Sequence, residues 1–77
     1  MSLNGTPLQP GRMWSLAKNG GTLTCVLHEN PDAGWELKLE LNGKLLRSDV
    51  CPDAVRVWKL TDRWRDRAVE KGWTVPT

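Results

Sequence analysis

The sequence predicts a small α+β domain in which a three-stranded antiparallel β-meander packs against one C-terminal α-helix. Three observations predict it. Apolar and polar residues alternate through residues 22–29 and 35–41, Asn42-Gly43 provides a hairpin turn, and apolar residues recur at helical spacing from residue 54 to residue 71. A chain of 77 residues has room for one domain, which buries only about 60% of the surface that its unfolded form exposes.

The domain is expected to span residues 13–73. Residues 1–12 contain Asn4-Gly5 and Pro10-Gly11 without an apolar period, which predicts a disordered N-terminal arm or leader. Trp14 and Leu16, followed by a turn signal at residues 18–21, favour an extra short N-terminal strand or a docked extended segment. Residues 74–77 are expected to be a tail.

The first strand of the predicted meander covers residues 22–29. Leu23, Cys25 and Leu27 alternate there with residues that suit a pleated surface. Pro31 and Gly34 then provide a turn, because proline presets one backbone dihedral and glycine permits another. The next strand places four apolar side chains on the same face: Trp35, Leu37, Leu39 and Leu41.

The hairpin over residues 34–51 is the most clearly predicted part of the chain. Asn42-Gly43 favours a two-residue type I′ turn, which pairs Leu41 with Lys44 and continues to Leu39 with Leu46, Leu37 with Ser48 and Trp35 with Val50. This register opposes like charges on the outer face, Glu36 to Asp49 and Lys38 to Arg47. A bulge in the last strand would relieve the repulsion.

A helix is predicted from Pro52 to Lys71. Pro52 fits a first helical turn, Asp53 complements the helix dipole, and Gly72 is a C-cap beyond which Trp73 can fold back. The apolar stripe is expected to cover the sheet, and its members are Ala54, Val57, Trp58, Thr61, Trp64, Ala68 and Val69.

Arg65 is expected near the middle of this stripe. A charge there is costly unless its head reaches water along a buried stem or is paired. Two interpretations follow: the guanidinium extends past the sheet edge, or it pairs with Glu29, Asp32 or an acidic partner.

The residues predict no enzyme and no metal or cofactor site. Cys25 and Cys51 are expected on the strands flanking the Trp35 strand, two spacings of about 4.8 Å apart, which predicts free thiols rather than a disulfide. His28, the only histidine, faces away from Cys25 on its strand, so no Cys-His pair or zinc motif forms. The sequence has no nucleophile motif and no glycine-rich phosphate loop.

Four segments resemble a group of small uncharacterised bacterial proteins built as a hairpin followed by one helix. They are residues 34–37, the Leu41-Asn42-Gly43 turn, residues 48–51 and the helix end at residues 70–73. The resemblance covers roughly residues 22–73 and lies at turn, core and cap positions. It implies the fold and no assigned activity.

Nucleic-acid binding is the alternative function. A three-stranded sheet with one helix resembles plant-type AP2 domains and some integrase arm-binding domains, which place an open sheet face on DNA. The net charge is only +2, and Glu36, Glu40 and Asp49 on the expected outer face oppose phosphate contact. Acidic residues also interleave the basic helix row. The candidate contacts are Lys38 and Arg47 on the sheet, and Arg56, Lys59, Arg63 and Arg67 on the helix.

Protein binding, including homodimerisation, is the favoured function. Five tryptophans without tyrosine or phenylalanine are unusual for so small a core, and Trp14 and Trp73 lie near its ends, where they either close the core or stay exposed as interface anchors. Val26 and Leu45 on the outer face and an open sheet edge add contact surface, and Arg65 is a further candidate. Without an apolar run that could span a bilayer or a signal-peptide pattern, the sequence predicts a cytoplasmic protein.

Overall fold

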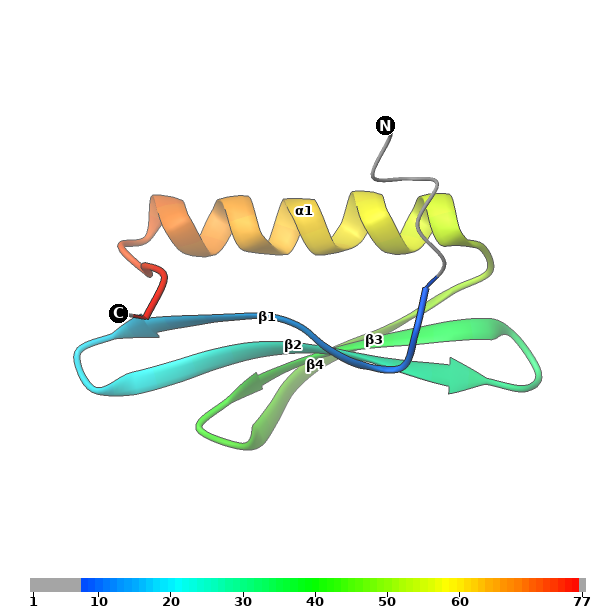
Figure 1. Cartoon of the computed structure of the whole chain (residues 1–77), viewed down its shortest axis with the longest axis horizontal. Coiled ribbons are helices and arrows are strands. Elements are labelled where there is room, and N and C mark those ends of the chain that lie inside the picture. The colour runs from blue at the N-terminus through cyan, green and yellow to red at the C-terminus, as the bar shows by residue number, and fades with distance from the viewer. Residues whose placement is uncertain (1–7, 77) are drawn as a thin grey trace.

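The computed structural model describes residues 8–76, which form one four-stranded antiparallel sheet and one α-helix (Figure 1). The strands follow one another across the sheet in chain order, and the helix lies along one of its faces. The predicted α+β architecture is confirmed, with one full strand more than the three expected. The elements are β1 (Gly11–Lys18), β2 (Gly21–Asn30), β3 (Gly34–Leu41), β4 (Lys44–Cys51) and α1 (Ala54–Glu70).

The additional strand is β1, which pairs with β2 over its whole length. Its turn has the same chemistry as the hairpin between β3 and β4: Asn19 and Gly20 have φ angles of 51° and 82°, and Asn42 and Gly43 have 51° and 83°. Because β1 begins at Gly11, it extends into the segment expected to be an arm, and its register shifts between Arg12 and Trp14. Residues 1–7 of that predicted arm lie outside the described residues.

The hairpin of β3 and β4 contains the bulge that charge repulsion favoured. Leu41 pairs with Lys44 and Glu40 with Leu45, but Leu39 pairs with Arg47, so Leu46 is an extra residue. The predicted pairing of Leu39 with Leu46 and all pairs beyond it are therefore wrong by one residue.

This shift reverses the faces of β4. Arg47 and Asp49 now lie on the helix side, opposite Leu39 and Leu37, whereas Ser48 and Val50 lie on the outer side. The expected like-charge pairs do not form. Instead the Ser48 hydroxyl donates a hydrogen bond to Glu36 over 3.3 Å.

The helix begins at Ala54, two residues later than predicted. Asp53 is its N-cap, with an extended φ of −148°, and its carboxylate accepts the backbone N–H of Arg56 over 2.9 Å. Pro52 therefore precedes the helix and is not part of its first turn. At the other end Gly72 has φ 97°, and the Trp73 N–H donates to the Ala68 carbonyl over 3.1 Å, as predicted for a glycine C-cap.

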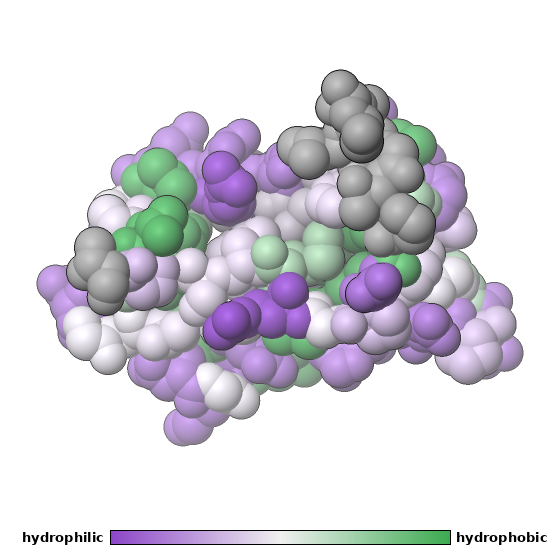
Figure 2. Space-filling model, in the orientation of Figure 1, coloured by the Kyte–Doolittle hydropathy of each residue, from purple (hydrophilic) through white to green (hydrophobic). Residues whose placement is uncertain are grey.

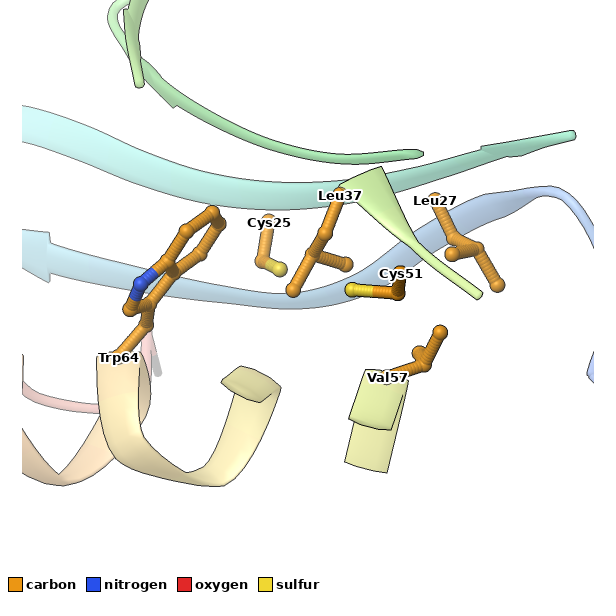
Figure 3. Packing of buried hydrophobic residues seen from close by; sticks show 6 residues of the cluster. All are labelled: Cys25, Leu27, Leu37, Cys51, Val57 and Trp64. Carbon is orange, nitrogen blue, oxygen red and sulfur yellow. The ribbon is translucent and has the colours of Figure 1, made fainter. Parts of the chain in front are cut away.

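The core lies between the sheet and α1. Side chains from three strands point toward two helix residues, Val57 and Trp64 (Figure 3). Trp64 is only 4% exposed. The sheet contributes Cys25, Leu27, Leu37 and Cys51 to this cluster. A second cluster of Leu16, Leu23 and Ala68 continues toward the C-terminal end of the helix, where Trp73 packs against it.

Gly34 fixes the passage from β4 to the helix. Its φ is +101°, and a Cβ at this position would lie 2.8 Å from the Pro52 carbonyl oxygen. The preceding turn is held by Asn30, whose Oδ1 accepts the backbone N–H groups of Asp32 and Ala33 over 3.1 and 3.2 Å. A side chain at residue 34 would therefore push apart two connections that meet at this point.

The two edges of the sheet differ. On the β1 edge, Ala17 and Thr74 exchange backbone hydrogen bonds of 2.7 and 2.9 Å, so Thr74 is not part of a free tail as expected. On the β4 edge, no backbone hydrogen bond to another segment forms within residues 8–76 beyond the β3 ladder. The described part of the chain thus leaves β4 as its unpaired edge.

Candidate interaction surface

The two tryptophans proposed as exposed anchors instead close the core. Trp14 is half-buried, and its Nε1 donates to the hydroxyl of buried Thr61 over 2.7 Å. Trp73 is also half-buried and packs against the cluster that contains Leu16 and Ala68. Of the two interpretations in the sequence analysis, the structure supports closure of the core.

Apolar surface instead gathers on β4. Leu45, Leu46 and Val50 are 57%, 56% and 52% exposed. Leu45 was predicted as a surface contact, whereas Leu46 and Val50 were missed because the predicted register placed both toward the helix. Val26, on the outer face of β2, is only half-exposed.

The backbone of β4 adds hydrogen-bonding capacity to this surface. A type I′ turn joins the carbonyl of Leu41 to the N–H of Lys44, and hydrogen-bonded and non-bonded pairs then alternate along an antiparallel ladder. Past the bulge, Arg47 and Asp49 continue the bonded pairs. The N–H and C=O groups of Ser48 and Val50 therefore point away from β3, toward the open edge.

A cationic groove of about 520 Å³ runs between β4 and α1. The helix residues that line it project toward β4 because they recur at three- and four-residue spacing on one flank. Four cations and one carboxylate contribute: Arg47 and Asp49 from β4, and Arg56, Lys59 and Arg63 from α1. Val50, Cys51 and Leu60 complete the lining.

Arg47 is held in position at this groove. Its guanidinium carbon lies 5.2 Å from the ring centroid of Trp64, and its Nε lies 3.1 Å from an Asp49 carboxylate oxygen. The register predicted from the sequence places Arg47 on the outer face with Lys38. The bulge at Leu46 moves it to the helix side, and Lys38 alone stays on the outer face, 3.9 Å from Glu36.

The basic row of the helix divides between two surroundings. Arg67 and Lys71 extend the cationic flank beyond the groove, beside Arg47 and Trp64. On the solvent side, the acidic residues Asp62, Asp66 and Glu70 lie among the basic ones, as predicted. Within the described residues the two ion pairs are Lys38–Glu36 and Arg47–Asp49, so the helix cations that line the groove have no carboxylate partner there.

Arg65 lies outside both surfaces. It is exposed, so its predicted place near the middle of the buried stripe is wrong, because the buried helix face is narrower than expected: Val57, Thr61, Trp64 and Ala68. Of the two interpretations given for Arg65, the ion pair with Glu29 or Asp32 is not formed in the described part of the chain.

The two cysteines are free, as predicted, and both are buried. Burial raises the pKa of the Cys25 thiol to about 11, although a contact of its Sγ with the Thr61 hydroxyl, at 3.7 Å, acts in the opposite direction. Burial also raises the pKa of Cys51, and the nearby carboxylates of Asp49 and Asp53 add to the effect. Both are protonated at neutral pH and are poor nucleophiles or metal ligands.

Among the described residues, no group of three or more histidine, cysteine or acidic side chains is placed to hold a metal ion. No helix of residues 8–76 is both long and apolar enough to cross a membrane. In Figure 2, hydrophilic side chains cover much of the displayed face, and apolar surface appears in separate patches.

Comparisons of the chain with protein-family models, with curated proteins and with solved structures find no significant match. The resemblance to small bacterial hairpin-and-helix proteins therefore stays a prediction.

Proposed function

We propose that this protein is a non-enzymatic binding module that recruits a partner polypeptide as an additional strand on β4. The observation that carries the proposal is the unpaired edge of β4, which combines outward backbone groups at Ser48 and Val50 with exposed apolar side chains. Strand addition uses these two components: main-chain hydrogen bonds supply affinity, and alternate side chains supply specificity.

The other edge is less suited to this role. Backbone hydrogen bonds between Ala17 and Thr74 occupy one end of β1, and the register shift between Arg12 and Trp14 disturbs the strand nearer its start. Bulges and covering segments are devices by which proteins block edge pairing.

Contact through the open sheet face, the AP2-like mode of nucleic-acid binding, has less support. With Arg47 on the helix side, the central part of the outer face carries Glu36 and Glu40 against Lys38. Two carboxylates against one ammonium group disfavour contact with a phosphate backbone.

The proposal can be tested by selecting random decapeptides displayed on phage against the full chain, followed by counter-selection against a Val50→Pro variant. Proline at residue 50 removes an N–H that points to the open edge and leaves the β3 ladder intact, so the variant should fold. Circular dichroism checks the fold, and Val50→Lys replaces the proline variant if that variant is unfolded.

Enriched peptides should bind the wild-type chain and shift backbone amide NMR signals of residues 44–51. Binding to Val50→Pro should be lost. Selection of peptides that bind both proteins equally, or that shift signals elsewhere, would refute β4 as the binding edge. Failure to enrich any peptide would refute the proposed module.

A further inference from the structure

The cationic groove lies directly beside the edge that is proposed to accept a strand. Arg47, Asp49, Val50 and Cys51 line the groove and belong to β4 itself. Because side chains alternate along a strand, an added strand would direct every second side chain toward the groove and the others toward Leu45 and Val50. One added strand would therefore contact both the groove and the apolar side chains of β4.

The charge in the groove is concentrated. Its four cations and one carboxylate leave an excess of three positive charges, whereas the whole chain has a net charge of +2. The rest of the molecule is thus slightly acidic. Arg47 is already oriented by its contacts with Trp64 and Asp49, which reduces the conformational entropy that a bound anionic group must overcome.

We infer that the strand added to β4 is an acidic segment of a partner protein, with carboxylates at alternate positions facing the groove and apolar side chains between them. This inference rests on the proposed function and names the chemistry of its partner. Arg56, Lys59 and Arg63 would bind the carboxylates, and Leu45 and Val50 would contact the apolar side chains on the outer face.

A second copy of the chain does not have this chemistry. Two-fold pairing of β4 with β4 places both helices on the same side of a continuous sheet, with their β4-facing flanks toward each other. Each flank carries Arg47, Arg56 and Arg63, with Asp49 as the carboxylate in the groove. Repulsion between the two flanks disfavours the homodimer that the sequence predicted as one form of protein binding.

Nucleic acid would neutralise the cations of the groove, but it would leave the apolar side chains and the edge backbone groups of β4 without partners. Leu45, Leu46 and Val50 are each more than half exposed. All three belong to β4, and Val50 also lines the groove. A phosphate backbone offers neither apolar side chains for them nor strand-pairing groups for Ser48 and Val50. A polypeptide supplies both.

Three synthetic peptides of equal length test the inference on the full chain. Each has a Gly-Ser cap at both ends and a central stretch in which valine alternates with glutamate, glutamine or lysine. The glutamate peptide should bind about tenfold more tightly than the glutamine peptide, and the lysine peptide should not bind. Amide NMR shifts should map to residues 44–51, and affinity should fall between about 50 and 300 mM NaCl because salt screens exposed charges.

A charge-reversal variant tests the groove directly. Arg56→Glu combined with Arg63→Glu changes the excess in the groove from positive to negative, so the lysine peptide should now bind and the glutamate peptide should not. The matched control is Arg12→Glu combined with Arg65→Glu, which makes the same change in net charge at two exposed residues outside the groove. The control should keep the wild-type preference.

The outcomes separate the two proposals. Equal binding of the glutamate and glutamine peptides at β4 would overturn the acidic partner and leave strand addition standing. A glutamate peptide with N-methylated backbone amides should bind more weakly than the unmodified glutamate peptide, and equal affinity of the two would overturn strand pairing. Saturable binding of a short DNA duplex, with no binding of the glutamate peptide, would also overturn it. No binding of any peptide at about 1 mM, the limit of weak specific affinity, would overturn both.

Discussion

The hydrogen bond between Trp14 and Thr61 gives the sharpest test of how this core is built. The sequence is compatible with Trp14 as a surface anchor or as a closure of the core, whereas in the structure its Nε1 donates to the Thr61 hydroxyl over 2.7 Å. Thr61→Val removes the hydroxyl at nearly constant volume, and Trp14→Phe removes the donor while keeping an aromatic ring. Combining them gives a double-mutant cycle for this one bond.

The expected size of the effect follows from burial. Thr61 is 3% exposed and Trp14 is half-buried, so both groups lie in a largely dry site. Thr61→Val leaves the Trp14 N–H without its acceptor, and Trp14→Phe leaves the Thr61 hydroxyl with only its 3.7 Å contact to Cys25 Sγ. An unsatisfied buried group costs about 1 to 3 kcal/mol, and the partial exposure of Trp14 favours the lower half of that range. For a domain of this size, about 1 to 2 kcal/mol corresponds to a decrease in Tm of about 4 to 16 °C.

The double variant should be less destabilised than the sum of the two single variants, by about 1 to 2 kcal/mol, because it contains neither orphaned group. Urea unfolding followed by circular dichroism measures all four proteins without depending on tryptophan emission. Strict additivity would refute the reasoning. It would mean that Trp14 does not depend on Thr61, as expected if its ring were held at the surface.

Three further predictions concern the core, a turn and a thiol. Trp64→Ala should lose about 3 to 5 kcal/mol, enough to unfold or nearly unfold the domain, and a thermal melt like that of the wild type would show that α1 does not pack as described. Gly34→Ala should lower the free energy of unfolding, measured in urea, more than Gly20→Ala does. Both residues have positive φ, but only at Gly34 would the new Cβ lie 2.8 Å from the Pro52 carbonyl oxygen. Equal decreases in the two variants would contradict this close contact. For Cys25, whose pKa is raised from 9.0 to about 11, the thiol of the unfolded chain loses its proton first as pH rises, so the free energy of unfolding should fall between pH 9 and 11. A Cys25→Ala variant should show a smaller decrease over this range. If the free energy of unfolding falls equally with pH in both proteins, the thiol is not buried as described.

The sequence was most informative where local chemistry alone determines the backbone. Asn42-Gly43 predicted a type I′ hairpin because few residues tolerate two positive φ angles in succession, and the observed values of 51° and 83° confirm it. The same dipeptide occurs at Asn19-Gly20 and carries the same turn signal. Before that turn only Trp14 and Leu16 supported a strand, so the sequence predicted a short strand or a docked segment there and not a full β1.

The candidate site was harder to predict because its position depends on one inserted residue. A bulge at Leu46 shifts β4 by one position, and since side chains alternate every residue, it exchanges the two faces of the strand. The pattern could indicate that repulsion favours a bulge, but the place of the insertion depends on packing between β4 and α1. Arg47 therefore moved from the expected outer face to the groove, and Val50 moved outward.

The narrow buried face of α1 was also not predictable from the sequence, because it depends on packing against the sheet. A sheet that curves beneath one helix buries only the side chains directly above it, so Arg65 and Val69 on the flank stay exposed although they adjoin the apolar stripe. Helical periodicity gives the direction of a stripe, but its width depends on the shape of the surface beneath it.

The pairing of Thr74 with Ala17 has a consequence for the behaviour of this protein at high concentration. A sheet with two open edges can add copies at both sides and grow into a fibre, because each addition leaves a new edge exposed. Here one end of the β1 edge is already paired with the chain's own C-terminal segment. Growth by repeated edge-to-edge addition therefore lacks a second regular edge, so the open β4 edge does not by itself make the sheet a template for filament formation.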